Sequence, residues 1–486
     1  MIKIYKTGRR RFLQSVILVV FVGLFCSLDF SGENESDLKW TREVGAKRFP
    51  KASKVYWAND YGAAGDGTTL NTKSLQSAID DCAVKGGGRV KFKPGQYLTG
   101  SVFIKEGVNL VIGKNVTILG SQAIEDYPEI ETRVAGIEMV WPAALINFVG
   151  ETNAAITGKG TIHAQGKPFW EKYWRMRRDE YEPKGLRWIV DYDCKRPRTI
   201  LVSRCKDITV KNITLMQAGF WTVHILYSEH ITVDGIVIRN NVDGSGPSTD
   251  GIDIDSSTRI LVKHCDIDCN DDNFCLKAGR DADGLRVNRP TEYIVIRNCI
   301  SRKGGGLVTC GSETSGGIRY VLAKNLKAEG TGTGIRLKSA KTRGGTVEYI
   351  YAENITMNGV RVVFQADLNW NPAYSYSSLP DGYVYGNLPA HWKVMLERVE
   401  PEEKGIPHFR NIYISNVKAD NAGTAIDAVG LENSQFENFY FTDVEISARQ
   451  GGRIHWGRDW TMRNVRIGTS ENERVEEKDC VNIRWE

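Results

Sequence analysis

The sequence predicts an all-β fold, a single-stranded right-handed parallel β-helix, on three observations. An alternating pattern of apolar and polar residues recurs along the chain, for example at residues 208–213, 231–236, 260–265 and 294–299. Successive copies begin roughly 20 to 35 residues apart, a spacing typical of solenoid repeats. Alternation with a period of two indicates strands with one buried face, and the 49 glycines suit tight turns between short strands. The right hand is the usual one for parallel crossovers.

Residues 1–31 are predicted to be an export signal that lies outside the fold. Basic residues as far as Arg11 precede an apolar run at 16–25, which is too short to cross a bilayer. Residues 9–14 resemble a twin-arginine signal, and an ordinary Sec signal with a basic start fits equally well. Cys26 stands where a lipoprotein cysteine would, but the large residue before it suits lipid anchoring poorly. We therefore expect an exported protein, either periplasmic or extracellular.

The rest of the chain is predicted to be a linker at 32–50 and one catalytic β-helix domain at 51–486. A solenoid grows along one axis, so a single domain of this length is allowed. Insertions at 163–200 and 368–408 interrupt the repeat and are rich in Trp and Tyr. Loops that leave a solenoid often form one wall of a binding site. Aromatic faces suit sugar rings, although aromatic residues also simply pin loops to a barrel.

Charge and composition argue against nucleic acid as a partner. The formal net charge is +5, and most of it belongs to residues 1–31, so the rest of the chain is nearly neutral. Beyond the signal, no stretch is apolar enough to span a membrane. We expect a monomer that uses no cofactor.

The ten cysteines would ordinarily suggest disulfides in an exported chain. Cys265 and Cys299, however, occupy the position that isoleucine holds in other copies of the repeat. We expect these two to be buried as small hydrophobic residues. No pair of cysteines has the spacing of a zinc site, and we expect no metal.

Two acidic clusters, at 248–253 and 269–273, are followed by glycine-led segments at 304–308 and 334–338. Placing Gly251, Asn273, Gly306 and Gly334 level makes the four segments equivalent strands of successive coils. The expected inward columns are then Ile252, Phe274, Leu307 and Ile335, followed by Ile254, Leu276, Thr309 and Leu337. The expected outward columns are Asp253, Cys275, Val308 and Arg336, followed by Asp255, Lys277, Cys310 and Lys338.

This alignment brings Asp250, Asp271 and Asp272 together on one exposed strip. Like charges raise the pKa of one carboxyl group, which can then serve as the general acid of a glycoside hydrolase while another serves as base or nucleophile. Stacked strands give an Asp250–Asp271 Cα separation of roughly 6 Å, which alternating side chains should widen toward the inverting arrangement. Arg336 and Lys338 lie two coils further on, about 10 Å away, and suit a substrate carboxylate.

Nearly all of the mature chain resembles the polygalacturonase family, glycoside hydrolase family 28. The segments at 60–67, 86–97 and 220–224 and the run at 277–284 match members of this family. The family's Asn-Thr-Asp motif appears as Ser248-Thr249-Asp250, its Asp-Asp pair as Asp271-Asp272 and its Arg-Ile-Lys as Arg336-Leu337-Lys338. The resemblance implies an inverting hydrolase of galacturonic-acid-containing pectic glycans. It also implies that Asp271 is the acid, that Asp250 and Asp272 activate water, and that Arg336 and Lys338 hold a substrate carboxylate.

Two departures from the family pattern leave the substrate open. The family's active-site histidine is replaced by Gly305, and the motif asparagine by Ser248, which we retain as a substrate-binding residue. His224 is a further substrate-binding candidate because its strand is expected to lie beneath Asp255. Alternatives are a rhamnogalacturonan hydrolase or exo-galacturonidase of the same family, a calcium-dependent β-elimination like that of pectate lyases, and a non-catalytic glycan-binding β-helix.

Overall fold

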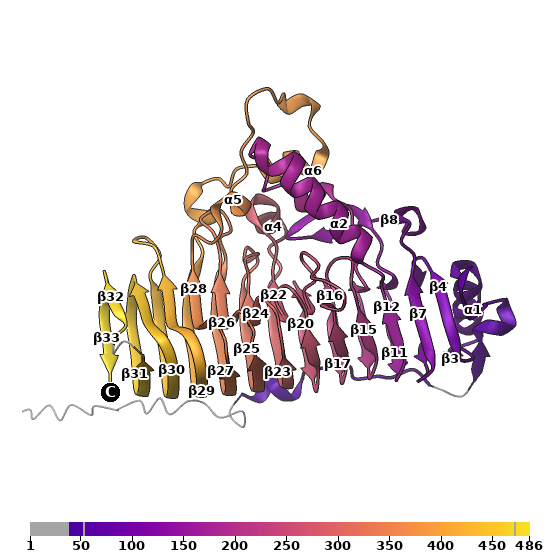
Figure 1. Ribbon diagram of the computed structural model, residues 1–486, viewed down its shortest axis with the longest axis horizontal. Coiled ribbons are helices and arrows are strands. Elements are labelled where there is room, and N and C mark those ends of the chain that lie inside the picture. The colour runs from indigo at the N-terminus through magenta and orange to yellow at the C-terminus, as the bar shows by residue number, and fades with distance from the viewer. Residues whose placement is uncertain (1–37, 52–53, 471–472) are drawn as a thin grey trace, which may run out of the picture.

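A computed structural model describes residues 38–51, 54–470 and 473–486 and confirms the parallel β-helix. Within these residues, 31 strands form one continuous parallel sheet, and two more form a small antiparallel hairpin. Figure 1 shows the strands lying side by side along the long axis of the molecule. The predicted export signal and Cys26 lie outside the described residues.

One stack of short strands carries the predicted site residues on its outer face. Its members are β5 (Val102–Phe103), β10 (Ile146–Val149), β13 (Ile200–Ser203), β16 (Val223–Leu226), β19 (Ile252–Asp255), β22 (Phe274–Lys277), β24 (Gly306–Cys310), β26 (Thr333–Lys338) and β28 (Val362–Asp367). The last coils extend this stack and end at β32 (Glu476–Lys478).

The other two sides of the solenoid begin as separate short strands and later merge into long ones. The second stack holds β1 (Val55–Trp57), β3 (Gly88–Lys91), β6 (Val108–Ile112), β11 (Thr152–Gly158), β14 (Lys206–Lys211), β17 (Glu229–Asp234) and β20 (Thr258–Lys263). The third holds β2 (Asp66–Leu70), β4 (Gly95–Thr99), β7 (Val116–Gly120), β12 (Thr161–His163), β15 (Thr214–Met216), β18 (Val237–Arg239) and β21 (Asp266–Asp268). The long strands are β23 (Thr291–Ser301), β25 (Ile318–Glu329), β27 (Thr346–Asn358), β29 (His408–Val429), β30 (Phe436–His455) and β31 (Gly457–Thr469). The short strand β33 (Val481–Trp485) pairs with β31 at the C-terminal end.

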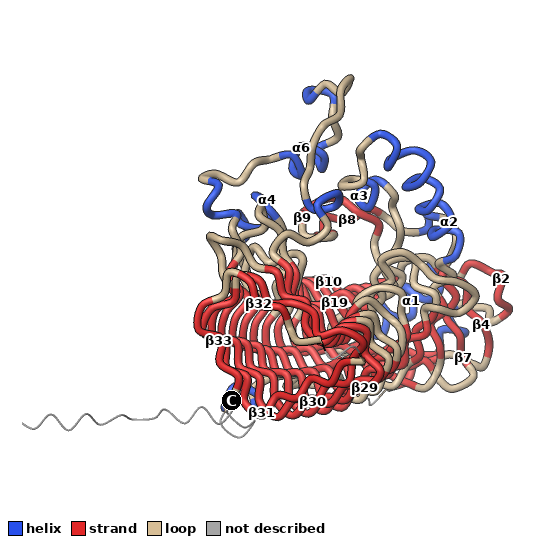
Figure 2. The backbone as a smooth tube through the Cα atoms, turned by 60° about the vertical axis from the view of Figure 1, so that its left-hand side comes forward, coloured by secondary structure: helices blue, strands red, loops and turns tan. Residues whose placement is uncertain are grey.

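Helices lie at one end and above one edge of the solenoid (Figures 1 and 2). Helix α1 (Thr72–Val84) covers the N-terminal end and buries Leu75 and Ile79 in the core. The remaining elements of the edge layer are α2 (Lys167–Arg175), α3 (Val190–Asp193), α4 (Asp281–Val287), α5 (Pro372–Ser375), α6 (Ala390–Leu396) and the hairpin of β8 (Glu129–Val134) and β9 (Ile137–Pro142). None of the described helices has the length and apolar character that crossing a bilayer requires.

The described part of the predicted linker is docked along the outside of the solenoid. The 3₁₀ turn η1 (Lys39–Arg42) follows Leu38, which packs with Val295 and Leu322. Further along, the Lys47 amide donates a hydrogen bond of 2.7 Å to Asp207. These contacts fix the segment on the face that β23 and β25 form.

The core is a ladder of inward side chains, and its register differs from the predicted one at β24. Phe274 pairs with Val308 and not with Leu307, so Val308 lies beneath Phe274 and above Ile335. The predictions that Val308 and Cys310 point outward are therefore wrong, since both lie in the core. Thr309 takes the outward position instead. The three glycines at 304–306 carry no side chain that could mark the register in the sequence.

The expected burial of Cys265 and Cys299 is confirmed. Both belong to the core ladder, and the Cys265 amide donates to the Cys299 sulfur at 3.4 Å. All nine cysteines in the described part of the chain are free thiols.

Candidate active site

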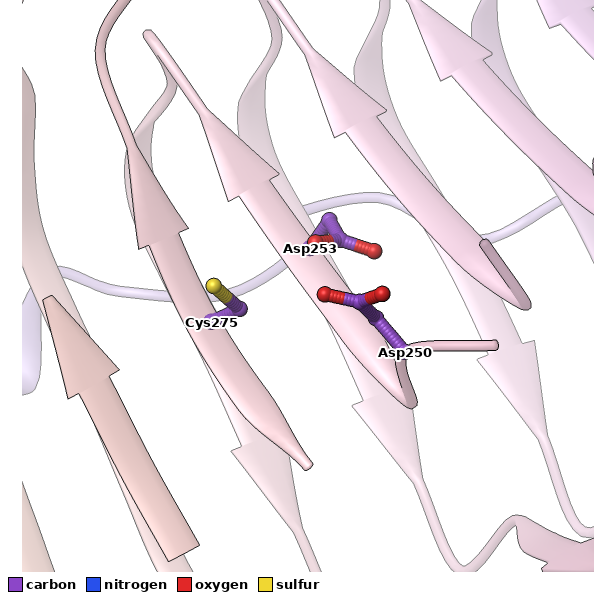
Figure 3. A group of neighbouring side chains, drawn as sticks. All are labelled: Asp250, Asp253 and Cys275. Atoms are coloured by element: carbon purple, nitrogen blue, oxygen red, sulfur yellow. The ribbon is translucent and has the colours of Figure 1, made fainter. Parts of the chain in front are cut away.

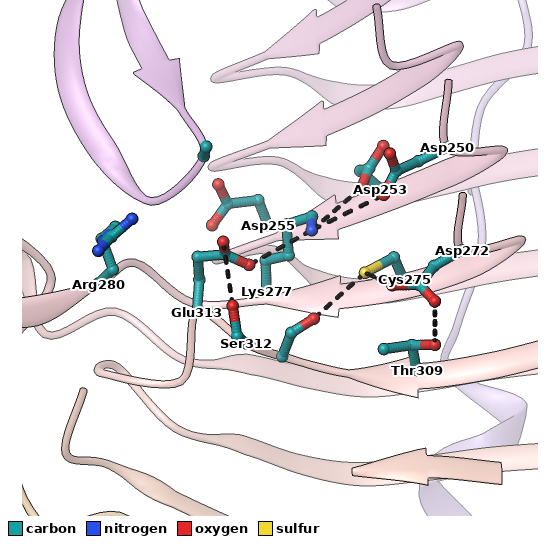
Figure 4. A network of polar contacts seen from close by, with 12 residues as sticks. Asp250, Asp253, Asp255, Asp272, Cys275, Lys277, Arg280, Thr309, Ser312 and Glu313 are labelled. Atoms are coloured by element: carbon teal, nitrogen blue, oxygen red, sulfur yellow. Dashed lines mark hydrogen bonds and ion pairs between the residues drawn. The ribbon is translucent and has the colours of Figure 1, made fainter. Parts of the chain in front are cut away.

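Four adjacent strands bring the predicted site residues together on the outer face of their stack. Asp250 lies just before β19, Asp271 and Asp272 lie just before β22, and Arg336 and Lys338 lie on β26. Strands β19, β22, β24 and β26 follow one another in the sheet, and alternate side chains of each point away from the core. Figure 4 shows a part of this site, with Asp250, Asp272 and their neighbours Lys277 and Thr309.

Asp272 is the most strongly held carboxylate of the site. Its Oδ1 accepts hydrogen bonds from the Thr309 hydroxyl at 2.9 Å and from Arg336 at 3.3 Å, and its Oδ2 accepts one from Lys338 at 2.8 Å. Burial alone would raise the pKa of Asp272, but the charges of Lys338 and Arg336 outweigh it and hold this pKa well below its usual range. Asp272 is therefore ionised at neutral pH.

These bonds correct the predicted spacing of the two cations. Arg336 and Lys338 stand two coils from Asp272, yet their long side chains reach back across β24 to contact it. The small residue at the intervening outward position, Thr309, leaves room for them. The prediction that the two cations lie about 10 Å from the acids is therefore wrong for the side chains, because both cationic groups contact the Asp272 carboxylate directly.

Asp250 and Asp271 differ from Asp272 in that the pKa of each is raised. Each of them, together with Asp272, offers an oxygen that lies within 4.8 Å of the others. Burial and the neighbouring carboxylates raise the pKa of Asp250 well above its usual range. Burial and the charge of Asp272 likewise raise the pKa of Asp271. The nearest carboxylate oxygens of Asp250 and Asp271 are therefore closer to each other than predicted, since the side chains were expected to hold them further apart than the Cα atoms.

Lys277 and Glu313 belong to the site although the sequence did not assign them to it. The Lys277 ammonium lies 3.3 Å from Glu313, 3.6 Å from Asp253 and 3.9 Å from Asp250 (Figure 4). Burial would raise the pKa of Glu313, but Lys277 and nearby arginines hold it below its usual range. The outward position of Lys277 on β22 was predicted, whereas nothing in the sequence pattern marks Glu313.

A cavity of about 190 Å³ opens directly onto the acids. Its floor comes from the β-helix and its roof from both insertions. The lining residues include Ser248, Asp250, Asp271, Asp272, Lys277 and Lys338 below, and Arg187, Asp191, Trp370, Asn371 and Tyr374 above. Both predicted insertions thus take part in the site.

The two insertions are joined to each other above this cavity. The Trp188 indole donates a hydrogen bond of 2.9 Å to the carbonyl of Ser378, and its ring meets that of Trp392 edge-on at 5.5 Å. The Trp392 indole in turn donates to Asp193 at 3.0 Å. These aromatic residues tie one loop to the other, while Trp370 and Tyr374 face the cavity.

The two remaining substrate-binding candidates lie in different places. Ser248 lines the cavity, and its hydroxyl donates to Asp191 at 3.4 Å. His224 is fully buried beneath Trp221, whose ring contacts it edge-on at 4.8 Å, and it is not among the lining residues. As predicted, it lies beside Asp255, at 3.6 Å. Burial lowers the pKa of His224 to about 4, which keeps it neutral.

Gly305 lies directly beside two of the catalytic candidates, Asp271 and Asp272. A Cβ atom added there would lie 3.1 Å from Asp272 Oδ1 and 3.4 Å from Asp271 Oδ1. Any side chain at this position would therefore contact both carboxylates. With glycine here, no side chain occupies the position expected for the family histidine.

Two groups of described side chains are close enough to share a cation. They are Asp250, Asp253 and Cys275 (Figure 3), and Asp250, Asp271 and Asp272. In both groups a basic side chain already lies beside the carboxylates: Lys277 in the first, and Lys338 with Arg336 in the second. The positive charge that these carboxylates require is thus supplied by the protein.

Comparison with known proteins places the chain in a family. The model of the glycosyl hydrolases family 28 matches residues 95–375, which include the whole acidic strip. The chain belongs to glycosyl hydrolases family 28. A family 28 relative from Vitis vinifera, named as a probable polygalacturonase, is 32% identical over 75% of this chain and 74% of its own length.

Two further relatives are named for cleavage at chain ends. An exo-poly-α-D-galacturonosidase from Dickeya chrysanthemi is 26% identical over 85% of this chain and 74% of its own length. The crystal structure of a hyperthermoactive exopolygalacturonase from Thermotoga maritima superimposes with a TM-score of 0.71 at 26% identity. That superposition covers 86% of this chain and 92% of the other.

Family membership settles the class of reaction. The chain is a glycoside hydrolase, so the lyase and the non-catalytic binder are no longer needed as alternatives. Its expected resemblance to polygalacturonases is confirmed.

Proposed function

We propose that this enzyme releases single galacturonic acid residues from the ends of pectic chains and oligosaccharides, by hydrolysis with inversion. The observation that carries the proposal is the small cavity of about 190 Å³ with the acidic residues at its floor. A site of this volume is smaller than the pockets that hold drug-sized ligands and suits one sugar ring. Residues of both insertions line the cavity opposite the acids, which favours a chain end over the middle of a long chain.

Asp271 is the general acid in this proposal. Its raised pKa lets it keep a proton at a pH where ordinary carboxyl groups have lost theirs. That proton passes to the glycosidic oxygen as the bond to the anomeric carbon breaks. The leaving sugar departs as a neutral alcohol.

Asp250 is the base, and Asp272 orients the attacking water. Both oxygens of Asp272 are engaged by Thr309 and two cations, so this carboxylate is a poor nucleophile and a poor base. Asp250 has a raised pKa and faces the cavity, as a base near neutral pH should. The 4.8 Å proximity of these groups is shorter than the separation usual for inverting pairs. Inversion is favoured here because both oxygens of Asp272 are engaged and Asp250 is assigned as the base that takes a proton from water.

The substrate's carboxylate is expected to bind beside Lys338 and Arg336. Lys338 lines the cavity, and its ammonium lies 4.3 Å from the centre of the Trp370 ring. The Arg336 Nε has no hydrogen-bond partner among the described residues. An aromatic face beside two cations suits a uronic acid ring with its charged group.

A rhamnogalacturonan substrate remains the second candidate because of Gly305. Gly305 presents no side chain beside Asp271 and Asp272, which fits a leaving sugar that differs from galacturonate. Export and a monomeric state are part of the proposal and rest on the sequence.

Products from defined substrates test this function. Oligogalacturonides labelled at the reducing end should shorten by one residue at a time, and the free sugar should appear from the first time point. Proton NMR should detect the anomer opposite in configuration to the substrate linkage. Early release of internal fragments, or a retained anomer, would contradict the proposal. Faster cleavage of a matched series of rhamnogalacturonan oligosaccharides than of the oligogalacturonides would identify rhamnogalacturonan as the substrate.

A further inference from the structure

Asp253 is a buried carboxylate that the proposed mechanism does not use. It projects from β19 beside Asp250 (Figure 3), and its side chain is 0% exposed. Neither of its oxygens has a hydrogen-bond partner among the described residues. A buried ionised carboxylate in such surroundings is costly, so its protonation state needs an explanation.

The balance of charge around the site points to two retained protons. The β-helix side of the site holds five carboxyl groups, from Asp250, Asp253, Asp271, Asp272 and Glu313, while Asp191 on the opposite wall has its own partners, Arg187 and Arg196. Among the described residues, the basic side chains within 4.0 Å of these groups are Lys277, Arg336 and Lys338. Three cations therefore face five carboxyl groups, and buried charges without a partner are strongly disfavoured.

The contacts show which groups keep these protons. Asp272 has two cations and a hydroxyl donor, and Glu313 has Lys277 at 3.3 Å, so both are ionised. One proton belongs to Asp271, which has no cation within salt-bridge distance among the described residues. The second belongs to Asp250 and Asp253, which share Lys277 and offer oxygens within 4.8 Å of each other.

Solvent access distinguishes the two members of this pair. Asp250 lines the cavity, where water can stabilise its charge, whereas Asp253 does not line it. Lys277 lies 0.3 Å closer to Asp253, at 3.6 Å against 3.9 Å, which is a small difference beside the contact with water. Ionising Asp250 therefore costs less than ionising Asp253.

Several charged or titratable groups face Asp253 from the surrounding elements. They are Asp250 on its own segment, His224 on β16, Cys275 and Lys277 on β22, Asp271 and Asp272 before β22, Glu313 after β24 and Arg198 before β13. Burial raises the pKa of Asp253, Lys277 opposes this, and the acidic neighbours add to the rise.

We infer that Asp253 holds the proton which Asp250 would otherwise carry, so that Asp250 is free to act as the base. The inference rests on the proposed function. During turnover Asp253 keeps its proton, Asp250 takes a proton from water, and Asp271 gives its proton to the leaving oxygen. Exchange with solvent then restores Asp250 and Asp271.

The test compares Asp253→Asn with wild type over a range of pH. Asn has the charge of a protonated Asp, so kcat/KM should stay within about threefold of wild type, against the loss of about 10²–10⁴-fold expected for Asp250→Asn. The acid limb of the pH profile, where kcat/KM falls as Asp250 gains a proton, should stay at the same pH as in wild type. If Asp253 is instead ionised, its removal should shift that limb down by about one pH unit or more, because a negative neighbour of Asp250 has gone. Such a shift, or loss of activity in Asp253→Asn, overturns the inference.

Asp255→Asn is the matched control on the same strand. Asp255 pairs with Arg133 at 2.9 Å and does not line the cavity, so this variant should lose stability while its acid limb stays in place. Neither variant should move the acid limb, so a shift in Asp255→Asn would show that the limb responds to buried carboxylates outside the cavity and would overturn the inference.

Infrared spectroscopy tests the proton without relying on turnover. In an Asp271→Asn background at neutral pH, a protonated carboxyl band should remain, and adding Asp253→Asn should remove it. Absence of that band in the Asp271→Asn enzyme would overturn the inference even if the proposed function holds. Conversely, lack of hydrolysis by wild type would refute the proposed function and leave the infrared result interpretable. If Asp253→Asn does not fold, Asp253→Ser serves in the same measurements.

Discussion

Lys338 donates a hydrogen bond of 2.8 Å to Asp272 although a complete strand, β24, lies between the coils that carry them. Both side chains are almost fully buried, with Lys338 5% and Asp272 1% exposed. The contact fixes Asp272 as an ionised group and places the cation beside the reacting carboxylates. The outward-facing lysine expected from the sequence is thus part of the buried site.

Lys338→Met should lower both stability and activity. The variant leaves a buried carboxylate with a weaker set of partners, which costs about 1.5–3 kcal/mol in the free energy of unfolding. The pKa of Asp272 is depressed in the folded state, so its stabilising contribution exists above its unfolded pKa of about 3.9 and is lost as pH falls. In denaturant unfolding, the stability difference between wild type and variant should therefore begin to shrink below about pH 4 and vanish only as pH approaches the lower, folded-state pKa of Asp272. A constant difference at all pH values would contradict this account.

Thr309→Val should slow turnover by removing the hydroxyl donor to Asp272 at 2.9 Å. A hydrogen bond to a charged group contributes about 1.5–3 kcal/mol, so kcat/KM should fall by roughly tenfold or more. Thr333→Val is the control, since the buried Thr333 hydroxyl has no hydrogen-bond partner among the described residues. Equal effects of the two substitutions on kcat/KM would show that Thr309 acts only through packing.

Much of this site follows from the sequence, and the exceptions have physical reasons. Alternating apolar residues predicted the solenoid, and the spacing of two acidic clusters correctly brought Asp250, Asp271 and Asp272 together. The register of β24 could not be predicted, because three glycines offer no side chain to align. The reach of Lys338 depends on the small side chain at Thr309 and on rotamers that a sequence pattern does not encode.

Trp188→Ala should loosen the roof of the cavity. The indole bond to Ser378 and the contact with Trp392 join the two insertions. Without them the end of the cleft should open, so products from a long polymer should include internal fragments besides the single sugar. Trp174→Ala is the control, because Trp174 packs with Tyr173 and with Arg178 of its own insertion. A product pattern that stays unchanged in Trp188→Ala would argue against the roof as the cause of chain-end cleavage.

Removal of divalent cations should not change the rate. Lys277, Lys338 and Arg336 already supply positive charge to the carboxylates of the site. We expect equal kcat/KM before and after EDTA treatment followed by gel filtration. A loss of activity that calcium restores would mean that one of the acidic groups holds a metal.

The central claim is that Asp271 protonates the leaving oxygen, and a comparison of two substrates tests it most directly. Asp271→Asn should lose about 10²–10⁴-fold in kcat on an oligogalacturonide, with its affinity for that ligand unchanged in calorimetry. On a galacturonosyl fluoride, whose leaving group needs no proton, the same variant should retain nearly the full rate. Equal losses on both substrates, or more than about a tenth of wild-type activity on the oligosaccharide, would contradict the assignment of Asp271 as the acid.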